Sequence, residues 1–419
     1  MINKYIFFIF LFFVFFVILA QSDIPTFSDR ITLGLIEDDD IDEASGIAAS
    51  SKNPGVIWVH NDSGDKNRIF AIDTSGNDLG EYTISGAENR DWEDIAVGSG
   101  PDDSKSYIYI GDIGDNDGQY TIKYIYRIEE PLVSLNQNSI KTTLSNVEKI
   151  SFYYPDSPRD AETLMLDPIT KDIFIISKRN SKIRIYRLPF PQSTTQNIEA
   201  EKSAEFQLEL DPEDDKPFNY LTAGDISKDG NEILIKSYIN IFYWYRNPNE
   251  TIPEVLSSRA PELLPFLNTI DESQGEAVCW KPFADKGYYT LSEEKIDYNG
   301  TTFTFPAYLY YYKRTSEITS LNDGNLNNDF RLYQNFPNPF NPVTKIKYTI
   351  PINNKHRNIN VQLVVYDVIG NEVALLKNEN QTPGNYEIEF NGSKLTSGIY
   401  YYELRFGNYR KVKKMVLLK

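Results

Sequence analysis

Carboxylates stand at fixed distances before apolar residues at several places in this chain, a pattern that suits cation binding or acid–base chemistry. The stretch RDWEDIAVG, residues 90–98, is the clearest case, because Asp91 and Glu93 lie four and two residues before Ile95. Five such stretches align, reading DEASGIA, DWEDIAVG, DAETLML, LTAGDIS and SQGEAVCW. Residues two apart on a strand share one face, so the paired carboxylates are expected to point the same way.

The alignment is centred on the apolar residues Ile47, Ile95, Leu164, Ile226 and Val278. Four positions earlier stand Glu43, Asp91, Asp160, Thr222 and Gln274, and two positions earlier stand Ser45, Glu93, Glu162, Gly224 and Glu276. If each stretch opens a strand that lines a common channel, these residues form two polar rings at one mouth. The ends of the following strands are expected to reach the same mouth with Asp62, Asp112, Lys178, Arg179, Lys236 and Glu293.

Converging carboxylates need neutralisation, and the sequence leaves three explanations open. Ca²⁺ takes six to eight oxygen ligands, and its predicted ligands here are Glu43, Asp62, Asp91, Glu93, Asp112, Asp160, Glu162 and Glu276. Internal cations could neutralise them instead, from among Arg90, Arg159, Lys178, Arg179 and Lys236. Alternatively, the carboxylates accept backbone N–H groups and only hold neighbouring segments together.

Two classes of function follow from the acidic and basic residues that are expected together at this mouth. One is binding of an anionic ligand bridged by Ca²⁺, for which Lys178, Arg179 and Lys236 are the predicted ligand-binding residues. The other is hydrolysis, phosphoesterase-like before glycosidase-like, in which a pair of carboxylates serves as acid and base. The sequence assigns no individual catalytic residue.

The elements that would position these residues are strands. Each of the first four aligned stretches opens four β-rich runs, and the fifth opens three. The alignment points are 48 to 69 residues apart, and the chain has 29 Tyr and 24 Phe. This pattern predicts an all-β, five-bladed β-propeller, with the segment RITLGLIE (residues 30–37) completing the last blade and PEVLSS (residues 253–258) as an outer strand. A sixth blade is the alternative if the insertion Leu132–Val147 hides a degenerate one.

The N-terminus and the composition narrow the class of protein. Residues 1–22 read as a secretory signal peptide, and no later segment is apolar and long enough to span a membrane. The net charge is −18, with the acidic residues concentrated before residue 331, which argues against nucleic-acid binding. A single cysteine, Cys279, excludes an intramolecular disulfide, and two histidines, His60 and His356, disfavour zinc sites and a Ser-His-Asp triad.

The tail carries the motifs NFPNPFNP, TKIKYTIP, VYDVIGNEV, GIYYYEL and KKMVLLK. These closely resemble the C-terminal sorting domain of type IX secretion substrates. The resemblance implies a partner in the type IX secretion machinery and a secreted or outer-membrane surface-attached protein. The predicted organisation is therefore a signal peptide at 1–22, a propeller at 23–315, a linker at 316–331 and a sorting domain at 332–419 that forms a small β-sandwich.

The body carries the motifs VIWVHNDSGD, DWEDIAVG, IYIGDIGDN, DAETLMLDP and QGEAVCW. It resembles an uncharacterised group of secreted bacterial propellers and, more distantly, the phytase-like, esterase-like and SdiA-regulated propeller families. The phytase-like resemblance implies calcium and phosphate-ester binding at the acidic mouth. No catalytic motif of that family carries over onto individual residues of this chain.

Overall fold

A computed structural model describes residues 25–179, 182–208, 220–266, 272, 275–282, 286–298, 301–315, 331–350, 359–368, 371–382, 384–406 and 409–419. The chain divides into two compact units, Met1–Thr319 and Ser320–Lys419, which are described separately. The predicted signal peptide lies outside the described residues, as does the predicted linker apart from Arg331. Among the described residues, no helix has the length and apolar character needed to span a membrane.

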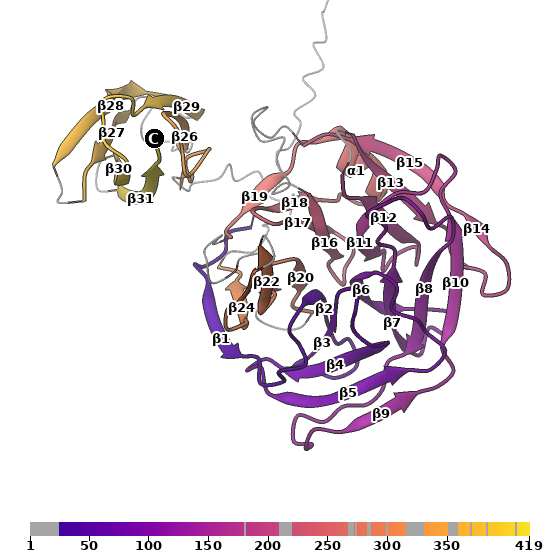
Figure 1. The fold of residues 1–419 in the computed structure, drawn as a ribbon. Coiled ribbons are helices and arrows are strands. Elements are labelled where there is room, and N and C mark those ends of the chain that lie inside the picture. Colours follow the sequence, from indigo (N-terminus) through magenta and orange to yellow (C-terminus); the bar gives the residue numbers. More distant parts are fainter. Residues whose placement is uncertain are drawn as a thin grey trace, which may run out of the picture. The chain divides into compact units, whose positions relative to one another are not determined.

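The described part of the N-terminal unit contains five sheets of four or five strands (Figure 1). The first runs β2 (Ala44–Ala49), β3 (Val56–Asn61), β4 (Arg68–Asp73), β5 (Asp78–Ile84) and β9 (Lys141–Leu144). The second runs β6 (Trp92–Ser99), β7 (Ser106–Asp112), β8 (Lys123–Glu129), β10 (Glu148–Tyr153) and β14 (Ile198–Glu199). The third runs β11 (Ala161–Leu166), β12 (Ile173–Ser177), β13 (Ile183–Leu188) and β15 (Glu201–Phe206).

The fourth sheet runs β16 (Leu221–Ile226), β17 (Glu232–Ser237), β18 (Ile241–Tyr245) and β19 (Glu262–Leu264). The fifth runs β20 (Ala277–Trp280), β21 (Gly287–Leu291), β24 (Tyr308–Lys313) and β1 (Ile31–Leu35), and a separate hairpin joins β22 (Lys295–Tyr298) to β23 (Thr301–Thr304). The pairing of β1 with β24, in which Ile31 lies opposite Tyr311, confirms that the N-terminal segment supplies the last strand of the fifth sheet.

The sheets are arranged around a common centre, as in a propeller (Figure 1). Their innermost strands are β2, β6, β11, β16 and β20, which carry the five aligned apolar residues. Each of these strands contacts the next, and β20 contacts β2, so the ring is closed. Separate apolar cores lie between successive sheets, for example Ile95 and Trp58 between the first and second. Burial of these faces is the main force that holds the sheets together.

One local prediction differs from the structure. The segment PEVLSS is not a strand: it lies in the helix α1 (Ile252–Ser258), and β19 takes the outer position in the fourth sheet. A capping box between Thr251 and Glu254 starts this helix, and its buried residues Ile252, Val255 and Leu256 have the i, i+3, i+4 spacing of a helical face. The insertion Leu132–Val147 contributes β9, which pairs parallel to β5 at the edge of the first sheet.

The C-terminal unit contains two sheets in its described residues. One consists of β25 (Arg331–Leu332), β26 (Val343–Ile350) and β29 (Gly384–Asn391), and the other of β28 (Glu372–Gln381), β27 (Ile359–Tyr366), β30 (Gly398–Phe406) and β31 (Tyr409–Leu417). They share one apolar core, in which Ile346 of the first sheet lies among Val361 and Leu404 of the second. The proline-rich motif binds along β31, because Asn338 Oδ1 accepts the Val416 N–H at 2.7 Å.

Candidate functional site

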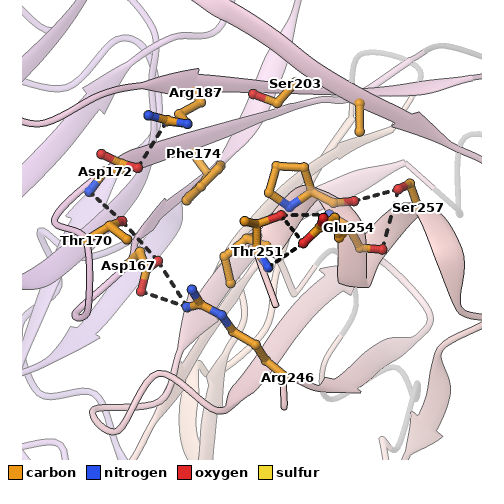
Figure 2. Close-up of a pocket in the computed structure, with 13 residues that line it drawn as sticks. Asp167, Thr170, Asp172, Phe174, Arg187, Ser203, Arg246, Thr251, Glu254 and Ser257 are labelled. Carbon is orange, nitrogen blue, oxygen red and sulfur yellow. Dashed lines mark hydrogen bonds and ion pairs between the residues drawn. The ribbon is translucent and has the colours of Figure 1, made fainter. Parts of the chain in front are cut away.

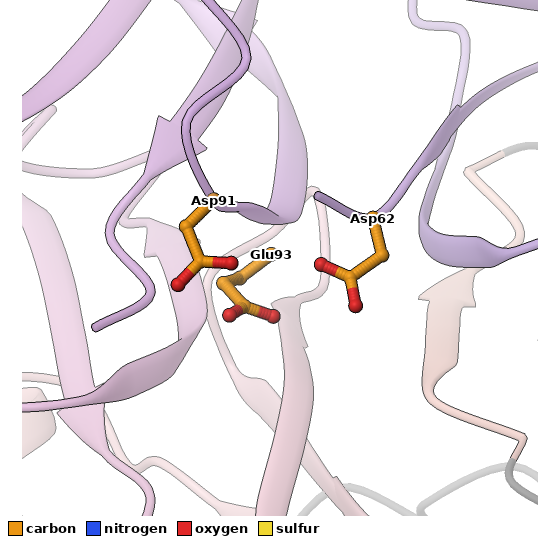
Figure 3. Close-up of side chains that lie close together, drawn as sticks. All are labelled: Asp62, Asp91 and Glu93. Carbon is orange, nitrogen blue, oxygen red and sulfur yellow. The ribbon is translucent and has the colours of Figure 1, made fainter. Parts of the chain in front are cut away.

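Five of the eight predicted metal ligands converge at one end of the inner strands. They form two triads that share Glu93: the first triad is Asp62, Asp91 and Glu93, and the second triad is Glu93, Asp160 and Glu162. Within each triad, one carboxylate oxygen from every residue lies within 4.8 Å of the others. Figure 3 shows the first triad, with the carboxyl groups of Asp62 and Asp91 on either side of Glu93.

Each triad joins two neighbouring sheets. Asp62 directly follows β3 of the first sheet, whereas Asp91 precedes β6 and Glu93 lies within it. Asp160 precedes β11 of the third sheet and Glu162 lies within it. Backbone hydrogen bonds hold the flanking loops, since the Asp62 N–H donates to the Glu43 carbonyl at 2.9 Å and the Gly114 N–H donates to the Asp91 carbonyl at 3.2 Å.

Glu93 is the unusual member of this cluster. Its residue is 3% exposed, yet its carboxyl group has no hydrogen bond or ion pair within the described part of the chain. Burial, followed by the charge of Asp62, raises the pKa of Glu93 well above its ordinary value. Burial also raises the pKa of Asp62 to about 7 and that of Asp91 to about 6. Ionising all three groups together is therefore costly unless a cation joins them.

Gly114 gives the carboxylates room. A Cβ atom at this position would lie 2.1 Å from Glu93 Oε1 and 2.5 Å from Asp91 Oδ2, both far inside contact distance. The backbone between β7 and β8 therefore packs directly against the first triad. This close approach favours a position without a side chain.

Internal cations neutralise other carboxylates at this mouth. Lys178 forms an ion pair with Glu162, and Arg179 Nε lies 3.0 Å from Asp160 Oδ2. Both cations therefore pair with carboxylates of the second triad. Asp112 is also paired, because its Oδ2 lies 2.8 Å from Arg90 Nε. In the described residues, no lysine or arginine forms an ion pair with a member of the first triad.

The remaining predicted ligands, Glu43 and Glu276, lie outside both triads. Glu276 is buried and accepts hydrogen bonds from Tyr238 Oη at 2.7 Å and from Ser45 Oγ at 3.2 Å. Glu293 lies near it, and burial together with the charges of Glu276 and Asp62 raises the pKa of Glu293 to about 9.

The three cations predicted to bind an anionic ligand have different surroundings. Arg179 is exposed, at 40% of its side chain, beside the cluster. Lys236 is fully buried and donates to the backbone carbonyls of Ser237 and Gly275. A lysine without solvent access and already bound to two carbonyls does not suit the predicted ligand-binding role. Lys178 is also buried, against Glu162.

Two further carboxylates, Asp94 and Asp225, also tie the sheets together, and the sequence reasoning did not assign them. Asp94 Oδ2 accepts the Leu164 N–H of β11 at 2.9 Å and the Gly224 N–H of β16 at 3.1 Å. Asp225 Oδ2 accepts the Trp280 N–H of β20 at 2.8 Å. The available signal was an aspartate directly before the aligned apolar residue in two of the five stretches.

A groove of about 480 Å³ lies near the opposite end of β11, beside α1 (Figure 2). Its two arginines are paired: Arg246 Nη1 lies 2.9 Å from Asp167 Oδ1, and Arg187 Nε lies 3.0 Å from Asp172 Oδ2. The groove therefore offers little unbalanced charge to a ligand.

The tail matches a known family. Residues 334–418 match the family model described as the secretion system C-terminal sorting domain. The C-terminal unit is a secretion sorting domain. The sorting domain confirms the prediction from the tail motifs, and it indicates a protein that is secreted or attached to the outer-membrane surface. It also implies interaction with the type IX secretion machinery.

Comparisons of the remaining chain are less specific, and no curated protein matches it. A luciferin-regenerating enzyme is 11% identical, with a TM-score of 0.36, over 67% of this chain and 96% of its own. A Trichoderma reesei carbohydrate-active enzyme of family AA12 is 10% identical, with a TM-score of 0.36, over 70% of this chain and 99% of its own. The Dos1 propeller is 10% identical, with a TM-score of 0.30, over 69% of this chain and 95% of its own. Similarity at this level assigns no activity.

Proposed function

We propose that this exported protein binds a divalent cation, Ca²⁺ in the first instance, at the first triad, and that the cation holds an anionic extracellular ligand. The body is, in this proposal, a five-bladed propeller over residues 23–315, closed by β1, and the sorting domain at 332–419 is a β-sandwich. Three carboxylates fill part of the coordination shell of Ca²⁺, which takes six to eight oxygens. Positions are left for water and for a ligand oxygen.

The observation that carries this proposal is the unpartnered carboxyl group of Glu93. Buried carboxylates in proteins are normally hydrogen-bonded or paired, because an isolated buried charge is strongly unfavourable. Glu93 is buried and has neither kind of partner in the described residues, whereas its neighbours Asp62 and Asp91 place their own oxygens close to it. A cation among the three would supply the missing partner.

Thermal unfolding of the full-length protein tests the cation site. A cation that binds the folded state alone stabilises it by about 2.7 kcal/mol at one hundred times its dissociation constant, which raises Tm by several degrees. We expect this rise with CaCl₂ relative to chelator, and its loss in Glu93→Gln. The matched control is Glu276→Gln, which removes the same charge nearby but outside the triad. No rise in the wild type, or equal loss in both variants, would refute specific binding.

A secreted hydrolase, phosphoesterase-like before glycosidase-like, is the second candidate. Glu293 favours it, because burial and the charges of Glu276 and Asp62 raise the pKa of this residue to about 9 in the cation-free protein, so its carboxyl group is protonated there at neutral pH. A protonated carboxyl group can serve as a general acid. Release of p-nitrophenol from p-nitrophenyl phosphate with Ca²⁺, lost in Glu293→Gln, would support hydrolysis; absence of turnover in the wild type would leave binding as the function.

A further inference from the structure

We infer that Lys178 occupies the position of a second cation, so that the mouth takes one divalent ion where the carboxylates alone would take two. This inference rests on the proposed function of the first triad. It concerns the second triad, Glu93, Asp160 and Glu162, in which one carboxylate oxygen per residue likewise lies within 4.8 Å of the others.

The two triads differ in their counter-charges. The ammonium group of Lys178 forms an ion pair with Glu162, and the lysine side chain is only 6% exposed, so it lies within the cluster. Asp160 is held by Arg179 at 3.0 Å and by the Asp115 N–H, which donates to its Oδ1 at 2.9 Å. Two positive side chains therefore compensate three carboxylates of the second triad, whereas the described residues supply no such pair to the first.

Lys178 does not satisfy every oxygen around it. Glu162 is 3% exposed, and its Oε2 atom is buried without a hydrogen-bond partner among the described residues. Glu93, shared by both triads, is also unpartnered. Two carboxyl groups of the second triad thus retain ligand atoms that the lysine leaves unused. Removing the ammonium group would leave three carboxylates with one compensating cation, a set that attracts a divalent ion.

The substitution of a lysine for a metal has a chemical consequence. Phosphoryl transfer by two metal ions needs both ions, about 4 Å apart, to hold the attacking and leaving oxygens. A centre with one divalent ion and one ammonium group that is already bound to a carboxylate lacks the second Lewis acid. The resident lysine therefore favours binding of an anionic group through a single ion over two-metal hydrolysis.

Calcium stoichiometry, measured by equilibrium dialysis of the full-length protein, tests this inference. We expect one ion per chain for the wild type, two for Lys178→Met, and one for Lys178→Arg, which keeps the positive charge. The double variant Lys178→Met/Glu162→Gln should return to one ion, because it removes a ligand of the second triad. Circular dichroism checks that each variant is folded.

The outcomes separate this inference from the proposed function. One ion in both the wild type and folded Lys178→Met would overturn the role of Lys178 and leave the first triad as a cation site. No ion in the wild type but one in Lys178→Met would overturn the proposed function and support the role of Lys178. Two ions in the wild type would overturn the inference directly, and this result does not depend on the folding of any variant.

Discussion

Asp94 joins three inner strands, and replacing it with asparagine measures what a structural carboxylate contributes to this fold. Its Oδ1 accepts the Ile95 N–H at 2.9 Å, and its Oδ2 accepts the N–H groups of Leu164 and Gly224. An asparagine side chain at this position would keep the shape but offer only one acceptor oxygen. Even in the better orientation, its NH₂ group would face the Ile95 N–H, so one hydrogen bond is lost and two donors meet.

The expected cost follows from these contacts. A buried donor left unsatisfied costs about 1–3 kcal/mol, and two remaining bonds to a neutral amide are each weaker than bonds to a charged oxygen by about 1 kcal/mol. Asp94→Asn should therefore destabilise the protein by about 3–5 kcal/mol, which corresponds to a Tm lower by roughly 6–20 °C for a domain of this size. Asp225→Asn, which affects the bonds to Ile226 and Trp280, should have a smaller effect.

Differential scanning calorimetry of the full-length variants checks this ranking, with the exposed Asp29→Asn as control. Asp94 is outside both triads, so the Ca²⁺-dependent rise in Tm should survive its replacement. A Tm for Asp94→Asn within about 2 °C of the Asp29→Asn control would refute the argument that these hydrogen bonds join the sheets.

Three further predictions concern the site and its surroundings. The pKa of Asp62 is about 7 and that of Asp91 about 6 in the folded chain, above the ordinary 3.8, so the folded state holds protons that the unfolded chain releases. In chelator, the contribution of these two groups to the free energy of unfolding should fall as pH rises from about 4 to 7. The Ca²⁺-dependent rise in Tm should be larger at pH 8 than at pH 5.5, because protons compete with the cation for the carboxylates. Equal rises at the two pH values would contradict this competition. Burial lowers the pKa of His60 from 6.5 to about 4. The free energy of unfolding should therefore fall by about 3 kcal/mol as pH falls through that interval, and His60→Gln should flatten this decline in urea unfolding. An unchanged pH profile in the variant would exclude His60 as the cause. Gly114→Ala should abolish the Ca²⁺-dependent rise in Tm, because its Cβ would displace Glu93 and Asp91, and a retained rise would show that the triad does not ligate in this geometry.

The sequence determined the periodic features of this protein. Alternation along a strand predicted that Asp91 and Glu93, and likewise Asp160 and Glu162, point the same way, because a strand has a local period of two. The structure brings each pair together, although the strand register shifts between Trp92 and Asp94 and between Ala161 and Thr163. The spacing of the aligned residues predicted the inner strands, and the motifs of the tail identified the sorting domain. The sequence pattern did not predict helix α1, because a segment of seven residues is too short for its periodicity to distinguish a helix from a strand.

The tertiary structure alone decided which charges meet. Asp62 comes from the first sheet and Asp91 from the second, so their approach depends on how neighbouring sheets pack around the centre. Lysines close in the predicted ring have different partners: Lys178 reaches Glu162, whereas Lys236 reaches two backbone carbonyls. Strand periodicity fixes the face that a side chain occupies, but the partner of a long, flexible side chain depends on the packing of segments far apart in sequence. For that reason, the sequence predicted an acidic mouth, and only the fold separated its unpaired triad from its lysine-paired one.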